Sequence, residues 1–171
     1  MIPTLENFGV TTPAYIRKIG ATTHWQQEDC NSQKDRAEKA AAKIFKDGVN
    51  SLYLVKSDQD FYATIVAISI NRNPQDQNFD FIWITEEELQ EAGINFELVI
   101  EGACLYSQKI HFNASINIQS ACELCENIMS KNREAKRCKK KDTKEILNYL
   151  ESLGCKAIVP NTPNCKCENQ N

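Results

Sequence analysis

The spacing of apolar residues predicts two helices in the first quarter of the chain. Apolar residues recur at helical spacing over residues 32–47, and Gly48 follows as a stop signal. Residues 12–20 also fit a short helix, because Pro13 suits a first helical position and Gly20 suits the end. We therefore expect the chain to begin with two helices.

A period of two begins at residue 51 and predicts strands. Residues 51–55 and 79–84 alternate in the manner of strands, and the continuous apolar run over 61–70 indicates a strand covered on both faces. The polar residues 57–60 between the first two strands indicate a turn. We expect 51–70 to form a hairpin.

Two further strands are predicted after a short helix. Thr85–Glu88 has the spacing of a capping box, which gives its three glutamates a structural role at a helix start. Apolar residues alternate over 96–105, with a glycine that suits a bulge, and most regularly over 110–118. His111 falls on the polar side of that last strand, so we expect it at the surface rather than as a ligand.

The last third predicts two helices and an edge strand. Ser120 and Glu123 have capping-box spacing at the start of the first helix. We expect Asp142 to begin the second helix and Gly154 to end it. We expect residues 155–160 to form an edge strand that ends in proline.

These elements predict an α+β fold, with a mainly antiparallel sheet of about five strands and helices packed against it. We assign residues 1–119 to the α+β core domain and residues 120–171 to a helical, cysteine-rich and basic extension packed on the same domain. The chain has neither the basic and apolar regions of a signal peptide nor an apolar stretch of bilayer length. We expect a cytoplasmic protein without a membrane partner.

Cysteines are concentrated in that extension. In a reducing compartment, cysteine thiols are buried, metal-bound or catalytic rather than paired in disulfides. Cys122 and Cys125 have the C-x-x-C spacing of a tetrahedral zinc site, but this spacing also fits the apolar stripe of a helix, or a redox-active pair. The predicted zinc ligands are Cys122, Cys125 and Cys138, with Cys155, Cys165 or Cys167 as the fourth. Core packing of the helix cysteines is the main alternative.

Positive charge is concentrated over residues 131–144, where eight basic residues accompany two acidic ones in a chain of net charge −3. Such a segment attracts nucleic-acid phosphates or an acidic protein surface. The alternative is a solvated loop that faces the chain's own acidic residues. No aromatic residue is interleaved, so contacts to nucleic acid would be to the backbone. The predicted anion-binding residues are Lys131, Arg133, Lys136, Arg137, Lys139, Lys140, Lys141 and Lys144.

Catalytic signatures are scarce. The sequence has no glycine-rich phosphate loop, no H-E-x-x-H and only two histidines. Its central element order resembles the restriction-endonuclease-like core, which implies a metal-binding site at Asp58, Asp60 and Asp80, but Ile82 stands where that core has lysine. We expect a non-enzymatic binding or regulatory protein stabilised by zinc. A metal-dependent nuclease or related hydrolase and a pure protein-interaction domain are the alternatives.

Overall fold

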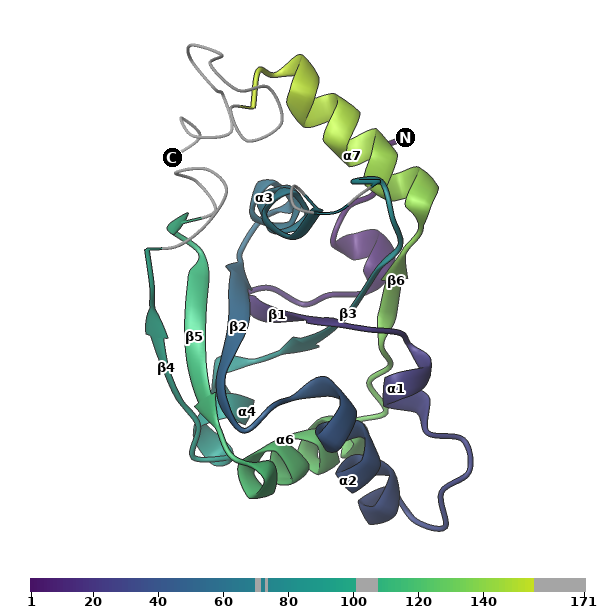
Figure 1. Ribbon diagram of the computed structural model, residues 1–171, viewed down its shortest axis with the longest axis vertical. Helices are drawn as coiled ribbons and strands as arrows, with labels where there is room; N and C mark the ends of the chain where they lie inside the picture. Colours follow the sequence, from purple (N-terminus) through teal and green to yellow (C-terminus); the bar gives the residue numbers. More distant parts are fainter. Residues whose placement is uncertain (70–71, 73, 101–107, 156–171) are drawn as a thin grey trace.

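The computed structural model describes residues 1–69, 72, 74–100 and 108–155 (Figure 1). In these residues, six strands form one antiparallel sheet in the order β4-β5-β2-β1-β3-β6, which confirms the α+β class. The strands are β1 (Ala14–Ile19), β2 (Gly48–Val55), β3 (Phe79–Ile84), β4 (Asn95–Leu98), β5 (His111–Ile116) and β6 (Lys136–Cys138). The helices are η1 (Glu6–Phe8), α1 (Thr23–Gln26), α2 (Gln33–Ile44), α3 (Asp58–Ser69), α4 (Glu86–Glu91), α6 (Ile118–Ser130) and α7 (Lys140–Ser152).

The sheet separates two apolar clusters. Helices α3 and α7 cover one face and helices α2 and α6 cover the other (Figure 1). Alternate side chains of β3 serve both faces: Phe81 and Trp83 join the α3/α7 cluster, whereas Ile82 and Ile84 join the α2/α6 cluster. Burial on both sides explains why this strand is apolar at nearly every position.

The helix predicted over residues 12–20 is wrong, because this segment contains the central strand β1. Tyr15 lies opposite Leu54 of β2 on one side and Ile84 of β3 on the other. The segment is too short for its apolar spacing to distinguish a helix from a strand. Pairing with two neighbours that are distant in sequence decides the outcome.

The strand predicted over residues 61–70 and the hairpin over 51–70 are also wrong. The run from Asp58 to Ser69 is helix α3, and β2 pairs instead with β1 and β5. A continuous apolar run fits a buried helix as well as a buried strand. Asp60 Oδ2 accepts from Ser57 N at 3.1 Å, and Ser57 Oγ accepts from Asp60 N at 3.3 Å. This reciprocal pattern, present in the predicted turn, is the start signal of the helix.

Two helix starts and three strands follow the predictions. The helix of residues 33–44 and strands β2, β3 and β5 lie where they were expected, and the capping box of Thr85 and Glu88 is confirmed. The predicted cap at Ser120 is wrong, because Asn117 is the N-cap of α6 and Ser120 is its reciprocal partner. The second helix begins at Lys140 rather than Asp142.

The C-terminal segment crosses from one face of the sheet to the other. Helix α6 packs beside α2, the short strand β6 extends the sheet beside β3, and α7 packs beside α3. Strand β6 was not predicted, because three residues are too few to show a period. Residues 120–155 are thus built into the sheet and both clusters. The predicted strand 155–160 lies outside the described residues except for Cys155, and the predicted strand 96–105 is described only as far as residue 100.

Candidate functional site

The described cysteines of the predicted zinc set lie on opposite faces of the sheet. Cys125 is fully buried in the α2/α6 cluster, and Cys122 lies half-buried beside it. Cys138 and Cys155 are fully buried in the α3/α7 cluster. In the part of the chain that the structure describes, no three histidine, cysteine, aspartate or glutamate side chains gather as a metal site would require. These positions favour core packing for the helix cysteines.

The remaining two predicted ligands, Cys165 and Cys167, lie outside the described residues. The thiols of Cys125 and Cys138 are held in the protonated form. Burial raises the pKa of the Cys138 thiol to about 11, although a contact of 3.5 Å with the Thr143 hydroxyl acts in the opposite direction. Burial also raises the pKa of Cys125 far above its ordinary value. Since the thiolate is the metal ligand and the nucleophile, neither thiol is poised for redox chemistry.

The first part of the basic segment serves an internal ion pair. The Glu88 side chain has no exposed surface, and Arg133 Nη1 donates to its Oε2 at 2.7 Å. Lys131 Nζ donates to Oε1 at 2.8 Å. The Arg133 guanidinium also lies over the Trp83 ring, 3.7 Å from the ring centroid. Arg133 and Lys131 are thus committed to the protein's own structure.

The charge of Glu88 depends on these partners. Burial alone would raise the pKa of Glu88, but the hydrogen bonds from Arg133, Lys131 and the Thr85 backbone outweigh burial and hold that pKa below its ordinary value. The carboxylate is therefore ionised at neutral pH within the fold. The same side chain completes the cap of α4, so one residue joins the helix start to the basic segment.

Arg137 forms a second fixed pair. Its Nε and Nη2 donate to the two carboxylate oxygens of Asp80 at 2.8 and 2.7 Å, a bidentate geometry that only arginine provides. Asp80 is 4% exposed and also accepts from Thr22 N at 2.9 Å. Three of the eight predicted anion-binding residues, including Arg137, thus bind buried or nearly buried carboxylates.

The described lysines that follow Cys138 in the sequence differ from Lys131, Arg133 and Arg137, because they are exposed and form no short ion pair with a described residue. Lys139, Lys140, Lys141 and Lys144 are exposed at the start of α7. Lys140 and Lys141 have only long contacts to carboxylates, at 3.9 and 4.0 Å. Lys139 and Lys144 form no ion pair with a described residue, and neither does the half-buried Lys136 of β6. These lysines are available to an external anion.

The acids of the nuclease alternative are not brought together. Asp58 and Asp60 begin α3, where they accept hydrogen bonds from Leu5 N at 2.8 Å and Lys56 N at 2.7 Å. Asp80 points to the opposite face of the sheet, where it holds Arg137 and the chain before α1. Each carboxylate therefore has a structural role in its own place.

His111 is buried, contrary to the prediction of a surface position. Its ring packs against Tyr53 with 5.2 Å between centroids, its Nδ1 lies 3.3 Å from the Val99 carbonyl oxygen, and 4% of the residue is exposed. Tyr53 lies opposite His111 in the register of β2 and β5, and its ring together with the Val99 carbonyl covers the imidazole on the polar side of the strand. The alternation in sequence did not reveal this cover.

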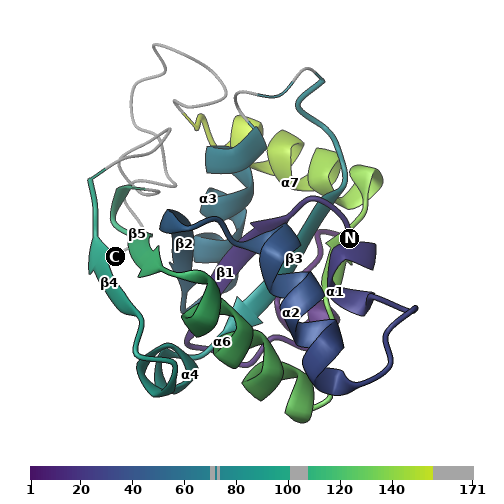
Figure 2. The same cartoon turned by 60° about the horizontal axis from the view of Figure 1, so that its bottom comes forward.

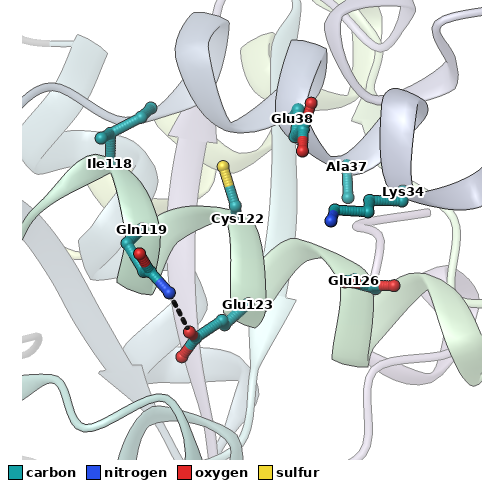
Figure 3. A pocket seen from close by; sticks show the side chains of 8 residues that line it. All are labelled: Lys34, Ala37, Glu38, Ile118, Gln119, Cys122, Glu123 and Glu126. Atoms are coloured by element: carbon teal, nitrogen blue, oxygen red, sulfur yellow. Dashed lines mark hydrogen bonds between the residues drawn. The ribbon is translucent and has the colours of Figure 1, made fainter.

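A groove between α2 and α6 was missed by the sequence predictions. The two helices lie side by side (Figure 2), and the groove has a volume of about 420 Å³. Figure 3 shows Cys122 projecting from α6 toward Glu38 of α2. The groove is lined by Lys34, Ala37, Glu38, Ile118, Gln119, Cys122, Glu123 and Glu126. The acidic pair at positions 123 and 126, three residues apart on one helix face, was the available signal.

Comparison with protein-family models, with curated proteins and with solved structures gave no match. The described helices include none with both the length and the apolar character that a bilayer span requires. Function is therefore inferred from the residues themselves.

Proposed function

We propose that this protein is a non-enzymatic binding protein whose exposed lysines at the start of α7 contact the phosphate backbone of a nucleic acid. The observation that carries the proposal is the division of the basic segment: the arginines bind the chain's own carboxylates, whereas Lys139, Lys140, Lys141 and Lys144 face solvent. Exposed lysines near a nucleic acid displace its counterions, which favours binding without sequence preference.

The position of these lysines is not explained by the stability of α7. The start of a helix carries partial positive charge, so cations there are unfavourable. Lys139 occupies the N-cap position and its side chain makes no capping hydrogen bond, unlike Ser32 of α2 and Thr85 of α4. A local structural role would favour acids at these positions. The lysines are better explained by an external anion.

A phosphate backbone suits this surface better than an acidic protein does. Protein interfaces are centred on buried aromatic, methionine or arginine anchors, and lysine is depleted from them. The exposed large apolar residues of the described chain are Met1, Val49, Leu98, Ile100 and Ile118, and none belongs to the lysine segment. The arginine nearest to an aromatic ring, Arg133, is already stacked on Trp83. Lysines without an apolar anchor are typical of backbone contact.

The experiment measures fluorescence anisotropy of labelled single-stranded and duplex oligonucleotides over a range of NaCl concentrations. Replacing Lys139, Lys140 and Lys141 together with glutamine is expected to weaken binding and to reduce the slope of log affinity against log salt by about 2 to 3. The matched control replaces Lys34, Lys43 and Lys46, which are exposed elsewhere, with glutamine. This control is expected to retain most of the affinity.

Three results would contradict the proposal. Equal affinity for the lysine variant and the parent would remove the segment from the site. Binding to polyglutamate without binding to either oligonucleotide would show an acidic protein partner instead. Cleavage of the oligonucleotide with Mg²⁺ that is lost in Asp60→Asn would favour the nuclease alternative.

A further inference from the structure

The groove between α2 and α6 combines an apolar floor with an acidic rim. Ile118 at the start of α6 is 56% exposed, an unusual exposure for an isoleucine on a packed helix. Ala37 and the half-buried Cys122 continue the apolar floor. Figure 3 shows these side chains between the two helices, with Glu38 above and Glu123 below. The floor would accept one apolar side chain from outside.

The rim carboxylates have no cationic partners in the described chain. Glu38, Glu123 and Glu126 form no ion pair with any lysine or arginine among the described residues, although Lys34 lies on the same rim. Glu123 accepts one hydrogen bond, from Gln119 Nε2 at 2.9 Å. This differs from Glu88 and Asp80, which hold arginines within the fold. Three carboxylates around an apolar floor attract a ligand of opposite charge.

We propose that this groove binds a basic peptide segment of a partner protein. One apolar side chain of the peptide lies on Ile118 and Cys122, and lysine or arginine side chains on either side contact Glu38, Glu123 and Glu126. This is the helix-in-groove type of recognition, in which apolar anchors give affinity and flanking charges give orientation. The site is separate from the lysine segment of α7.

Other ligand classes fit the groove less well. A metal ion would need three or more donors close together, and the described residues contain no such group. A nucleic acid or another anion would be repelled by three carboxylates that only Lys34 offsets. A basic peptide satisfies both the charge of the rim and the apolar floor.

Cys122 provides a local reporter of occupancy. Burial raises the pKa of its thiol, and Glu38, Glu123 and Glu126 raise it further, so alkylation is slow but measurable in alkaline buffer. Cys30, half-exposed before α2, is an internal reference outside the groove. A peptide that lies on the groove floor should protect Cys122 and leave Cys30 unchanged.

The probe is a short helical peptide of alanine, lysine and leucine, with the leucines on one face. Control peptides replace its leucines with alanine or its lysines with glutamate. We expect the probe to bind in a saturable manner and to slow iodoacetamide alkylation of Cys122 by about fivefold or more, measured for each cysteine by mass spectrometry. Each control peptide should protect Cys122 much less.

Variants of the groove test the same contacts from the protein side. Replacing Glu38, Glu123 and Glu126 with lysine should weaken probe binding by about tenfold or more. The matched control reverses three exposed acids elsewhere, Glu6, Glu97 and Glu151. Ile118→Ser tests the floor without changing charge. If circular dichroism shows that the triple variant is unfolded, the single variant Glu123→Lys takes its place.

Three results would overturn the proposal. Probe binding without protection of Cys122 would place the peptide elsewhere. An equal loss of affinity in the control triple variant would mean that probe binding depends only on the net charge of the protein and not on the groove. Sedimentation velocity that shows self-association, abolished by the groove variants, would make a second copy of this chain the occupant. The glutamine variant of Lys139, Lys140 and Lys141 should bind the probe normally. Failure of the nucleic-acid proposal would therefore not contradict the proposal that the groove binds a basic peptide.

Discussion

The two halves of the basic segment, before and after Cys138, have the same sign of charge but different roles. Before Cys138, Arg133 and Arg137 bind Glu88 and Asp80, carboxylates that are 0% and 4% exposed. After Cys138, the lysines of α7 face solvent with long or absent ion pairs. A dense run of positive charge therefore contains both a structural part and an available part.

The type of residue follows this division. A guanidinium forms two parallel hydrogen bonds and stacks on an aromatic ring, so it suits a buried carboxylate. An ammonium on a flexible stem is strongly hydrated and costs little when left in water. In this segment, arginine indicates internal pairing and lysine indicates a displayed charge, with Lys131 beside Glu88 as the exception.

The largest effect is expected when Arg133 is removed. Arg133→Ala leaves Glu88 buried with Lys131 alone and should lower the free energy of unfolding by about 3 kcal/mol. Urea unfolding checks this value, with the exposed Lys144→Ala as the control. The double variant Glu88→Gln, Arg133→Leu should lose less than the sum of its single changes, because it leaves no buried charge unpaired and the remaining Lys131 side chain is 47% exposed to water. A loss below about 0.5 kcal/mol in Arg133→Ala would contradict an internal role.

The second largest effect is the loss of the stability contributed by ionised Glu88 as the pH falls. The pKa of Glu88 in the folded protein is held below its ordinary value despite burial, because Arg133, Lys131 and the Thr85 backbone hydrogen-bond to it. Its ionisation therefore stabilises the fold fully above the ordinary carboxyl pKa of about 4.3, and this contribution is lost as pH falls through the lower folded value.

Urea unfolding at several pH values should show parent and Glu88→Gln differing by a constant amount above about pH 5, with the difference narrowing below about pH 4. Glu87→Gln, exposed on the same turn, is the control and should follow the parent throughout. A difference that does not change with pH would mean that the charge of Glu88 contributes nothing.

Removal of Arg137 should lower the free energy of unfolding by less than removal of Arg133 does. The Arg137 side chain is 44% exposed, so in Arg137→Ala water can replace part of the hydrogen bonding that Asp80 loses. Asp80 also keeps its hydrogen bond from Thr22 N. We expect a loss of about 1 to 2 kcal/mol in the free energy of unfolding. Arg137→Lys should recover only part of this loss, because one ammonium cannot form the bidentate pair. Full recovery by lysine would show that charge alone matters at this position.

The smallest effect on stability is expected from the exposed lysines. Changing Lys139, Lys140 and Lys141 to glutamine should alter the free energy of unfolding by less than about 0.5 kcal/mol, and the sign should favour the variant because the helix start loses unfavourable charge. Thermal and urea unfolding measure this change. A large destabilisation would assign these lysines to the fold and would leave no reason to propose a ligand for them.

Local signals in the sequence were reliable where one element contains the whole pattern. The capping box at Thr85 and Glu88 is complete within four residues, and the strand of 111–116 shows its alternation by itself. The same kind of signal was present at Ser57 and Asp60. Because it was interpreted as a turn, helix α3 was not predicted. Short-range hydrogen bonds leave short-range patterns, and these patterns are visible without a structure.

The candidate sites were only partly visible. The eight basic residues were identified, and so was the alternative that they face the chain's own acids, but the partners Glu88 and Asp80 lie about 40 to 60 positions away in sequence. The pair spacing of Cys122 and Cys125 suggested zinc, whereas a helix face explains the same spacing. The groove needed two helices far apart in the chain, so neither helix alone revealed it.

By itself, the sequence determined the α+β class, the uneven distribution of charge and the starts of α2 and α4, because these follow from composition and from neighbours within one turn or one strand. Only the tertiary structure decided that 14–19 is a central strand, that His111 is buried, that Cys125 and Cys138 lie on opposite faces, and which cations remain free. The physical reason is that burial and ion pairing depend on residues distant in the chain, whose approach is set by the packing of the whole sheet.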